Sequence, residues 1–401
     1  MSFNWKTKPL GEVASNVSRR FNFTGKDKVI FINTGDVLEG AFLHSDYSDT
    51  KGLPGQAKKA IEKGDILYSE IRPGNKRYVL VDFDPKDYVV STKFMVIKPS
   101  DEILPEFLYL ILTSRDCEQE FKIIADSRSG TFPQVTFDSI SYFPINYPDK
   151  AEQKRILQIT DSLSGKLAVN AETNQTLEQI AQSIFKSWFV DFDPVKAKIE
   201  TLAAGGSADD AELAAMGVIS AKTLDELNSL KASNPEAFNK LAQTATLFPA
   251  AMQDSELGEI PVGWEVKQLK DILELAYGKA LKKTDRVDGD VPVYGSGGLT
   301  GYHNQSLVEG PGIIVGRKGT VGSVYWEPKA FYPIDTVFYV KPRAGYSLKY
   351  CHLVLQNLGL KDMNTDAAVP GLNRDNAYRL DVITPTKDVM NLFKEIMQTL
   401  Q

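Results

Sequence analysis

Two carboxylates and a lysine lie close together in the sequence, at Asp191, Asp193 and Lys196, and their spacing superficially resembles a nuclease centre. The group lies at the end of an expected helix, and no other catalytic pattern supports it. The chain has no Asn/Asp-Pro-Pro-aromatic run of an adenine methyltransferase, no Gly-x-Gly cofactor loop leading from a strand into a helix, and no Gly-x-x-x-x-Gly-Lys-Ser/Thr loop for ATP. Three scattered His and two Cys do not have the spacing of a zinc site. We therefore expect no catalytic residue, no metal and no cofactor.

Side chains that could read DNA bases gather on polar loops. Arg makes paired hydrogen bonds with guanine, and Asn or Gln makes them with adenine. The candidates in the first half of the chain lie on loops 69–77 and 126–135, and are Arg72, Asn75, Lys76, Arg77, Arg128, Ser129, Thr131 and Gln134. Those in the second half are Ser296, Tyr302, His303, Asn304, Arg317, Lys318, Thr320, Asn373 and Arg374. For each residue, we favour a solvated loop position or a phosphate contact over base readout, because most protein–DNA hydrogen bonds go to the sugar-phosphate backbone of the DNA.

The two halves of the chain carry the same landmarks in the same order. Trp5 and Trp264 each begin a short amphipathic stretch, and each half later has a strand ending in Lys-Pro, at Pro99 and at Pro342. A helix, a polar loop and a final strand running into a Pro then follow in both halves. Such self-similarity predicts one fold used twice, because a repeat is one structural unit.

Both halves have the pattern of α+β modules. Runs 30–32, 65–68, 78–81, 93–97 and 142–145 are typical of short strands. Residues 104–124 show the apolar spacing of one helix, and 348–358 take its place in the second half.

A long helix separates the modules. Asp149 followed by Glu152 is a capping-box-like start, and apolar residues then keep a 4-3 spacing from Ile156 to Trp188, which predicts roughly 50 Å of coiled-coil-type helix. A helix lying on a domain surface is the alternative. A shorter helix after Thr386 repeats the seam with Met390, Phe393, Met397 and Leu400.

These patterns give the following predicted organisation: a first module over 1–150, a central helix over 151–200, a linker with short helices over 201–254, a second module over 255–386, and a distal helix over 387–401. The seam on the central helix is about twice as long as the distal one. We therefore predict that its C-terminal half is uncovered and that Phe185, Trp188 and Phe189 anchor a partner.

Composition limits the possible classes of protein. The 401 residues are 42% hydrophobic and 24% charged, which is ordinary for a globular protein, and no apolar run reaches the roughly 18 residues of a membrane span. The two Cys fall on different predicted helices, so we expect no disulfide and a reducing, cytoplasmic location. The net charge of −6 comes from the middle of the chain, so charge gives no positive support for DNA binding.

Several runs together resemble the specificity subunit of type I restriction-modification systems. The most specific runs from Gln182 to Lys198 and reads QSIFKSWFVDFDPVKAK. Others are Leu247–Pro249 with Ser255–Trp264, Ala151–Ile156, and the glycine-rich runs YGSGGLTG at 294–301 and VGRKGTVG at 315–322.

This resemblance implies a non-catalytic subunit that recognises double-stranded DNA. Each target-recognition domain would read one half of a split target. The long helices would set the spacing and dock modification (methyltransferase) subunits, and restriction subunits through them. In the family the second helix is normally as long as the first. The short helix after Thr386 is a departure, for which natural shortening, truncation and completion by a second copy are the alternatives. A tandem protein- or glycan-binding adaptor on the same duplicated scaffold is the alternative.

Overall fold

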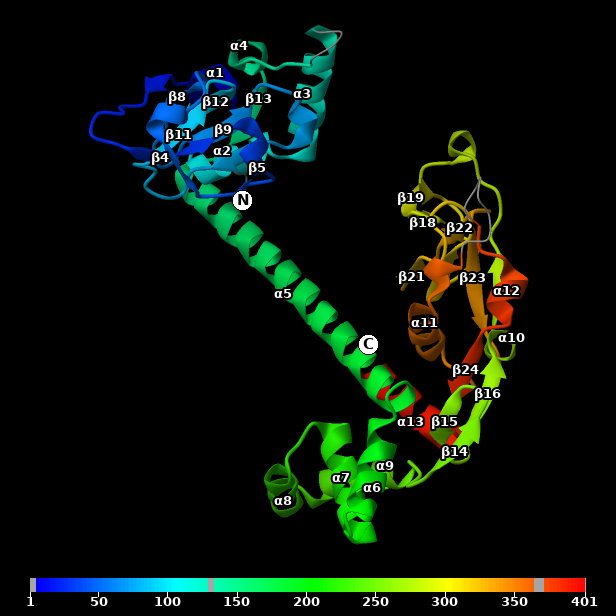
Figure 1. Cartoon of the computed structure of the whole chain (residues 1–401). Helices are drawn as coiled ribbons and strands as arrows, with labels where there is room; N and C mark the ends of the chain where they lie inside the picture. The colour runs from blue at the N-terminus through cyan, green and yellow to red at the C-terminus, as the bar shows by residue number, and fades with distance from the viewer. Residues whose placement is uncertain (1–4, 129–132, 364–370, 401) are drawn as a thin grey trace. The chain divides into compact units, whose positions relative to one another are not determined.

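The computed structural model describes residues 5–128, 133–363 and 371–400. The chain divides into two compact units, Met1–Asn170 and Ala171–Gln401 (Figure 1). The first unit contains the first module and the start of a long helix, whose end belongs to the second unit. None of the described helices is both long and apolar enough to cross a membrane.

The first module is built around a four-stranded sheet with the order β10-β9-β12-β2. Its strands are β2 (Ala14–Asn16), β9 (Ile66–Ser69), β10 (Tyr78–Leu80) and β12 (Phe94–Pro99). A five-stranded sheet has the order β3-β8-β11-β4-β7. Its strands are β3 (Arg19–Arg20), β4 (Lys28–Ile32), β7 (Tyr47–Asp49), β8 (Ala57–Ala60) and β11 (Tyr88–Ser91), and a small hairpin joins β5 (Val37–Leu38) to β6 (Ala41–Phe42).

Side-chain alternation along the central sheet produces three layers. Ile66 and Tyr68 of β9 point to one face, where they pack with helices α1 (Leu10–Val13), α2 (Pro105–Leu112), α3 (Arg115–Arg128) and α4 (Phe137–Ile140). Leu67 points to the other face and packs with Ile30 and Val90 of the five-stranded sheet. A strand buried on both faces needs apolar residues at successive positions, which is what β9 has.

The second module repeats the four-stranded central sheet, and its outer sheet has three strands where the first module has five. Its central sheet has the order β17-β23-β20-β21 and consists of β17 (Leu273–Tyr277), β20 (Gly312–Gly316), β21 (Val324–Glu327) and β23 (Val337–Pro342). Ile313 and Val315 face helix α11 (Leu348–Asn357), whereas Ile314 packs with Phe331 on the other side. The outer sheet has the order β19-β18-β22 and consists of β18 (Val291–Gly295), β19 (Gly298–His303) and β22 (Tyr332–Pro333).

Matching strand pairs confirm that one topology is used twice. In the first module, β1 (Lys6–Pro9) pairs antiparallel with β13 (Pro144–Tyr147). In the second, β16 (Glu265–Gln268) pairs in the same way with β24 (Asp381–Thr384). Helix α10 (Leu269–Ile272) then stands where α1 stands in the first module. Each outer sheet also contains one parallel pair, β4 with β11 and β18 with β22. The predicted α+β fold and its duplication are therefore correct.

The expected single helix over 104–124 is wrong in detail. Helix α2 ends at Leu112 and α3 begins at Arg115, because Ser114 Oγ accepts the Cys117 N–H at 3.3 Å and so starts a new helix. Helix α11 agrees closely with the expected 348–358.

Helix α5 (Lys150–Phe189) is the predicted long helix. Asp149 Oδ1 accepts the N–H groups of Ala151 and Glu152, both at 3.0 Å, which confirms Asp149 as its N-cap. The helix ends eleven residues before the predicted limit of 200, and α6 (Asp193–Ala203) follows after Phe192, which has a positive φ of 55°.

Residues 193–246 form a small helical bundle, which contains the short helices expected within 201–254. It consists of α6, α7 (Ala208–Ser220), α8 (Leu224–Ser233) and α9 (Pro235–Thr246), and Ala215, Met216 and Leu227 lie in its core. Capping boxes begin α7 at Ser207 and α8 at Thr223. The Ala-rich composition resembles a linker, but small residues let short helices pack closely.

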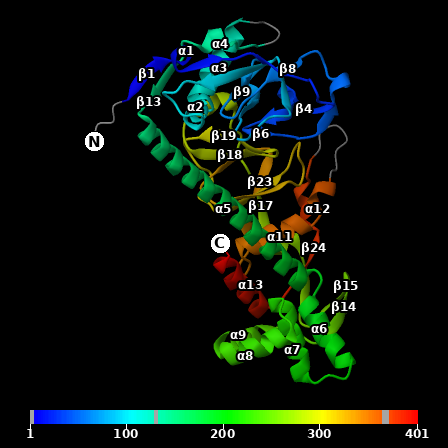
Figure 2. The same cartoon turned by 90° about the vertical axis from the view of Figure 1, so that its left-hand side faces the viewer.

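Helix α13 (Lys387–Thr399) lies beside the C-terminal end of α5 (Figure 2). Phe393 is fully buried, and its ring centroid is 4.9 Å from that of Phe189 and 6.2 Å from those of Phe185 and Trp188. The prediction that this half of the central helix is uncovered is therefore wrong. Besides α13, this apolar face packs against Tyr350 of α11, Phe248 and Trp264.

Candidate nucleic-acid interface

Two loops that are distant in sequence meet in each module. In the first module, Ile71 forms a bridge with Gln134, and the Val135 N–H donates to Glu70 O at 2.8 Å. In the second, Lys318 forms a bridge with Gly371, and the Leu372 N–H donates to Arg317 O, also at 2.8 Å. In the first module the structure thus joins the loop after β9 to the loop before α4. In the second it joins the loop after β20 to the loop before α12 (Arg374–Tyr378). Most of the predicted base readers lie on these loops, and the others lie on the β18–β19 hairpin.

The predicted residues of the first module differ in exposure and in their contacts. Arg72, Asn75 and Gln134 are exposed, and the Arg72 N–H donates to Pro133 O at 2.9 Å. Lys76 Nζ pairs with Glu39 Oε1 at 2.9 Å, whereas Arg77 Nη1 donates to the carbonyls of Gly35 and Val37 at 3.0 and 2.8 Å. Arg77 therefore already holds the β5 segment in place.

Three further candidates lie at the limit of what the structure describes. Arg128 ends α3, and its side chain lies outside the described residues. Ser129 and Thr131 lie outside them altogether.

In the second module, Ser296 lies beside the Arg317 loop. Its carbonyl accepts the hydroxyl of Ser323 at 2.7 Å and that of Tyr325 at 3.2 Å, and Gly319 would carry a Cβ only 3.3 Å from Ser296 Oγ. Thr320 is exposed on the same turn. The β18–β19 hairpin tip and the β20–β21 turn therefore form one polar surface with Arg317 and Lys318.

The other end of the β18–β19 hairpin holds the remaining candidates. Gly295 pairs with Gly298 at the hairpin tip, whereas Val291 pairs with His303 at the open end. Tyr302 and Asn304 are exposed at that open end. His303 is buried, and its Nδ1 accepts the Val287 N–H at 3.1 Å, so the expectation that it lies on an exposed loop is wrong. Its ring is held 5.8 Å from that of Tyr332.

The loop before α12 contributes one helix cap and one guanidinium that lies over an aromatic ring. Asn373 Oδ1 accepts the N–H groups of Asp375 and Asn376 at 2.9 and 3.1 Å, so Asn373 is the N-cap of α12 (Arg374–Tyr378). The Arg374 guanidinium lies 4.8 Å from the centroid of the Tyr277 ring. Arg317 lies 4.9 Å from the same ring. Sequence reasoning missed Tyr277, because it ends a strand rather than lying on a glycine-rich loop.

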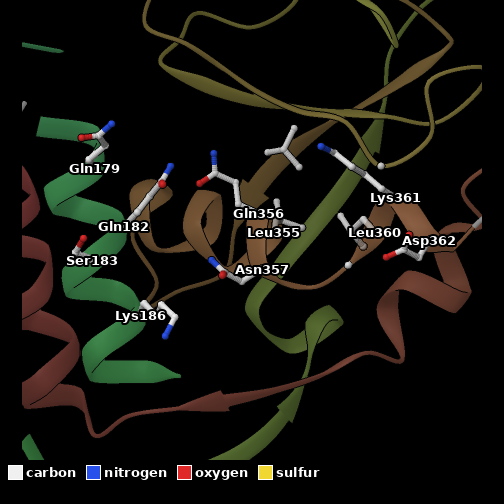
Figure 3. Close-up of a pocket in the computed structure, with 13 residues that line it drawn as sticks. Gln179, Gln182, Ser183, Lys186, Leu355, Gln356, Asn357, Leu360, Lys361 and Asp362 are labelled. Atoms are coloured by element: carbon white, nitrogen blue, oxygen red, sulfur yellow. The ribbon is translucent and has the colours of Figure 1, made fainter. Parts of the chain in front are cut away.

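A polar groove of about 830 Å³ lies elsewhere in the second unit (Figure 3). Its α5 side presents Gln179, Gln182, Ser183 and Lys186, and its other side presents Gln356 and Asn357 of α11 with Lys361 and Asp362. At its edge, Lys349 pairs with Glu178, and burial followed by the Lys349 charge lowers the pKa of His352 to about 4. Amide side chains dominate the groove, and within the described residues no cluster of His, Cys, Asp and Glu is arranged to hold a metal.

The predicted partner anchors lie away from solvent. Phe185, Trp188 and Phe189 are 4%, 2% and 5% exposed, and they form the aromatic core between α5, α11 and α13. The exposed apolar residues of α5 are instead Ile159, Leu163, Leu167 and Val169 near its start, with Ile180 further along.

Comparison with known proteins identifies the family. The model of the type I restriction modification DNA specificity domain matches residues 3–179 and 261–384. The chain belongs to this family. It is 43% identical over 422 residues to the type I restriction enzyme HindI specificity subunit of Haemophilus influenzae, covering 98% of this chain and 92% of that protein.

Other similarities are more distant. The type I restriction enzyme MjaIX specificity subunit of Methanocaldococcus jannaschii is 26% identical over 197 residues, covering 48% of this chain and 44% of that protein. The crystal structure of the HsdS subunit from Thermoanaerobacter tengcongensis has a TM-score of 0.42 and 16% identity, covering 99% of this chain and 89% of that one.

Membership gives the chain its role. It is a DNA target-recognition subunit of a type I restriction-modification system, and it is not the catalytic subunit. The alternative of a protein- or glycan-binding adaptor has no support from these comparisons.

Proposed function

We propose that each module of this specificity subunit reads one half of a bipartite DNA target. The observation that carries the proposal is the repeated loop bridge, Ile71 with Gln134 and Lys318 with Gly371. In both modules the bridge joins two polar loops at the end of the central sheet. A surface made from two loops on a rigid sheet suits recognition, because the sheet positions the side chains before they meet DNA.

In the first module the candidates on these loops are Arg72, Asn75 and Gln134, and all three are exposed. In the second module Lys318 and Thr320 are exposed, whereas Arg317 and Arg374, with Ser296 beside them, are half-buried. Arg side chains suit guanine edges and phosphates, and the amides suit adenine. Helix α5 would fix the number of base pairs between the half-sites, because a continuous helix is stiff. The protein would act on DNA in the cytoplasm. Both of its buried cysteines are free thiols, which fits a reducing compartment.

We further propose that the start of α5 docks a modification subunit. Ile159, Leu163 and Leu167 recur at every fourth position and are 52%, 57% and 70% exposed. Such a stripe on a stable helix is typical of a protein interface. Through that subunit the chain would also join the restriction subunits.

The test is selection of duplexes from a randomised library by the full chain assembled with its modification subunits. We expect two enriched half-sites separated by a fixed spacer. Replacing Arg72, Asn75 and Gln134 together with Ala should alter one half-site only. Enrichment of a single continuous site, or of no site, would contradict the proposal.

A further inference from the structure

Two guanidinium groups from different loops lie close to the Tyr277 ring. Arg317, from the β20–β21 turn, is 4.9 Å from the ring centroid, and Arg374, at the start of α12, is 4.8 Å from it. Cations at these distances are attracted to the ring face. The Tyr277 side chain is 47% exposed, so this assembly lies at the surface.

Neighbouring residues hold the assembly rigidly. The Tyr277 and Phe338 rings are 5.1 Å apart, and Arg317 lies 5.8 Å from Phe338 while its Nη1 donates to Asp335 O at 3.0 Å. Arg374 lies 5.7 Å from Tyr378, whose hydroxyl accepts the Leu275 N–H at 2.9 Å. Both arginines are therefore oriented by aromatic surfaces.

The arginines keep hydrogen-bonding capacity for a ligand. Within the described residues, neither guanidinium pairs with a carboxylate, and of the Arg374 nitrogens Nε is buried without a hydrogen-bond partner. A guanidinium has five N–H donors in a planar fork, and stacking on a ring leaves the edge of that fork free.

The first module lacks this assembly at the equivalent places. Ala14 pairs with the Pro that ends β12, and Leu273 pairs with the Pro that ends β23. Ser18 and Tyr277 lie equally far along the chain from these two residues, so Ser18 corresponds to Tyr277. Glu70 corresponds to Arg317, because each carbonyl accepts the equivalent N–H across the loop bridge. Phe137 and Arg374 are the first residues of α4 and α12. The two modules share a fold but differ at all three positions.

We propose that Arg317, Tyr277 and Arg374 form the specificity element of the second module and read a guanine in its half-site, with Tyr277 as the positioning residue. The inference rests on the proposed function. A difference confined to one of two like modules is expected where they read different bases, whereas phosphate contacts need no such difference. Paired hydrogen bonds from Arg to guanine O6 and N7 are the commonest specific contact in the major groove.

The test is the same duplex selection, made with the assembled complex carrying single variants. Arg317→Lys and Arg374→Lys keep the charge but lose the planar fork, and Tyr277→Leu removes the ring face. We expect each to reduce discrimination for guanine at one position of one half-site by roughly 5- to 150-fold, leaving the other half-site unchanged. Tyr277→Phe keeps the ring and should restore the preference. Tyr142→Leu, at a tyrosine that is 84% exposed in the first module, is the matched control.

Each outcome decides the proposal. An enriched half-site without guanine, or one that the three variants leave unchanged, overturns it. A uniform loss of affinity with a smaller salt dependence assigns these arginines to phosphate and also overturns it. Failure of the wild-type complex to select any bipartite site would instead contradict the proposed function itself.

Discussion

The role of Lys198 in the helical bundle shows how one residue can hold several elements together. Its Nζ donates to Glu212 Oε1 at 2.7 Å and to the carbonyls of Ala245 and Phe248, both at 2.8 Å. The side chain is 3% exposed, and an ammonium buried this deeply is stable only with such partners. Lys198 therefore ties α6 to α7 and to the end of α9.

We expect Lys198→Ala to destabilise the bundle by about 2–4 kcal/mol, because Glu212 and two buried carbonyls lose their donor. This destabilisation is smaller than that expected for a fully buried ion pair, because the Glu212 side chain is 34% exposed. Hydrogen exchange of α7 and α9 would measure the change. Lys196→Ala, on the exposed side of the same helix, should have little effect. Equal exchange in the two variants would contradict this role.

His352 gives the second unit a predicted pH dependence. Burial, followed by the Lys349 charge, lowers the pKa of His352 to about 4, against about 6.5 in an unfolded chain. The unfolded state therefore binds the proton more readily. This contribution to stability is complete above pH ~6.5 and is lost as the pH falls toward 4, by at most about 3 kcal/mol.

The measurement is hydrogen exchange of α11 between roughly pH 7 and pH 5, corrected for the intrinsic exchange rate. We expect His352→Gln to flatten the dependence of stability on pH. His44→Gln, in the first unit, should leave it in place. A dependence that persists fully in the His352 variant would show that other groups cause it.

At the scale of elements, the β20–β21 turn depends on a glycine. A Cβ on Gly316 would lie 2.1 Å from Thr320 O and 2.3 Å from Ser323 Oγ, so no side chain fits inside this turn. The same turn carries Arg317 and Lys318 to the proposed DNA surface.

We expect Gly316→Ala to distort the turn at a cost of about 1–3 kcal/mol and to weaken binding of the second half-site roughly 5- to 150-fold. Gly297→Ala is the matched control, because its nearest atom is 3.9 Å away and its φ is not positive. Competition binding with duplexes altered in one half-site would separate the two modules. Similar affinities for both variants would show that the turn geometry is not needed.

At the scale of the molecule, the surface of α5 decides which partners the chain can bind. Its aromatic end is already covered by α11 and α13, whereas Leu163 and Leu167 are exposed near its start. We expect Leu163→Ser with Leu167→Ser to weaken assembly with a modification subunit while changing stability by less than about 0.5 kcal/mol per residue.

Size-exclusion chromatography with light scattering, with and without that subunit, would measure both assembly and self-association. Gln182→Ala with Lys186→Ala, in the polar groove, provides the comparison. Loss of assembly only in the groove variant would move the docking site there. Loss of self-association instead of assembly would identify a second copy as the occupant of the stripe.

The sequence alone determined the duplication, the α+β class and the long helix. Each depends on local periodicity, such as the apolar run of β9 and the 4-3 spacing of α5, and caps such as Asp149 mark where elements begin. The helical bundle could also have been predicted, because Ser207 with Asp210 and Thr223 with Glu226 are capping-box pairs.

Only the tertiary structure decided which residues meet. Phe185, Trp188 and Phe189 follow the helical pattern of an exposed seam and of a core equally well, and their burial depends on α11 and α13. Tyr277, Arg317 and Arg374 are distant in sequence, and the bridge between two loops brings them onto one ring. Periodicity describes which face of an element is apolar, whereas long-range packing determines what covers that face.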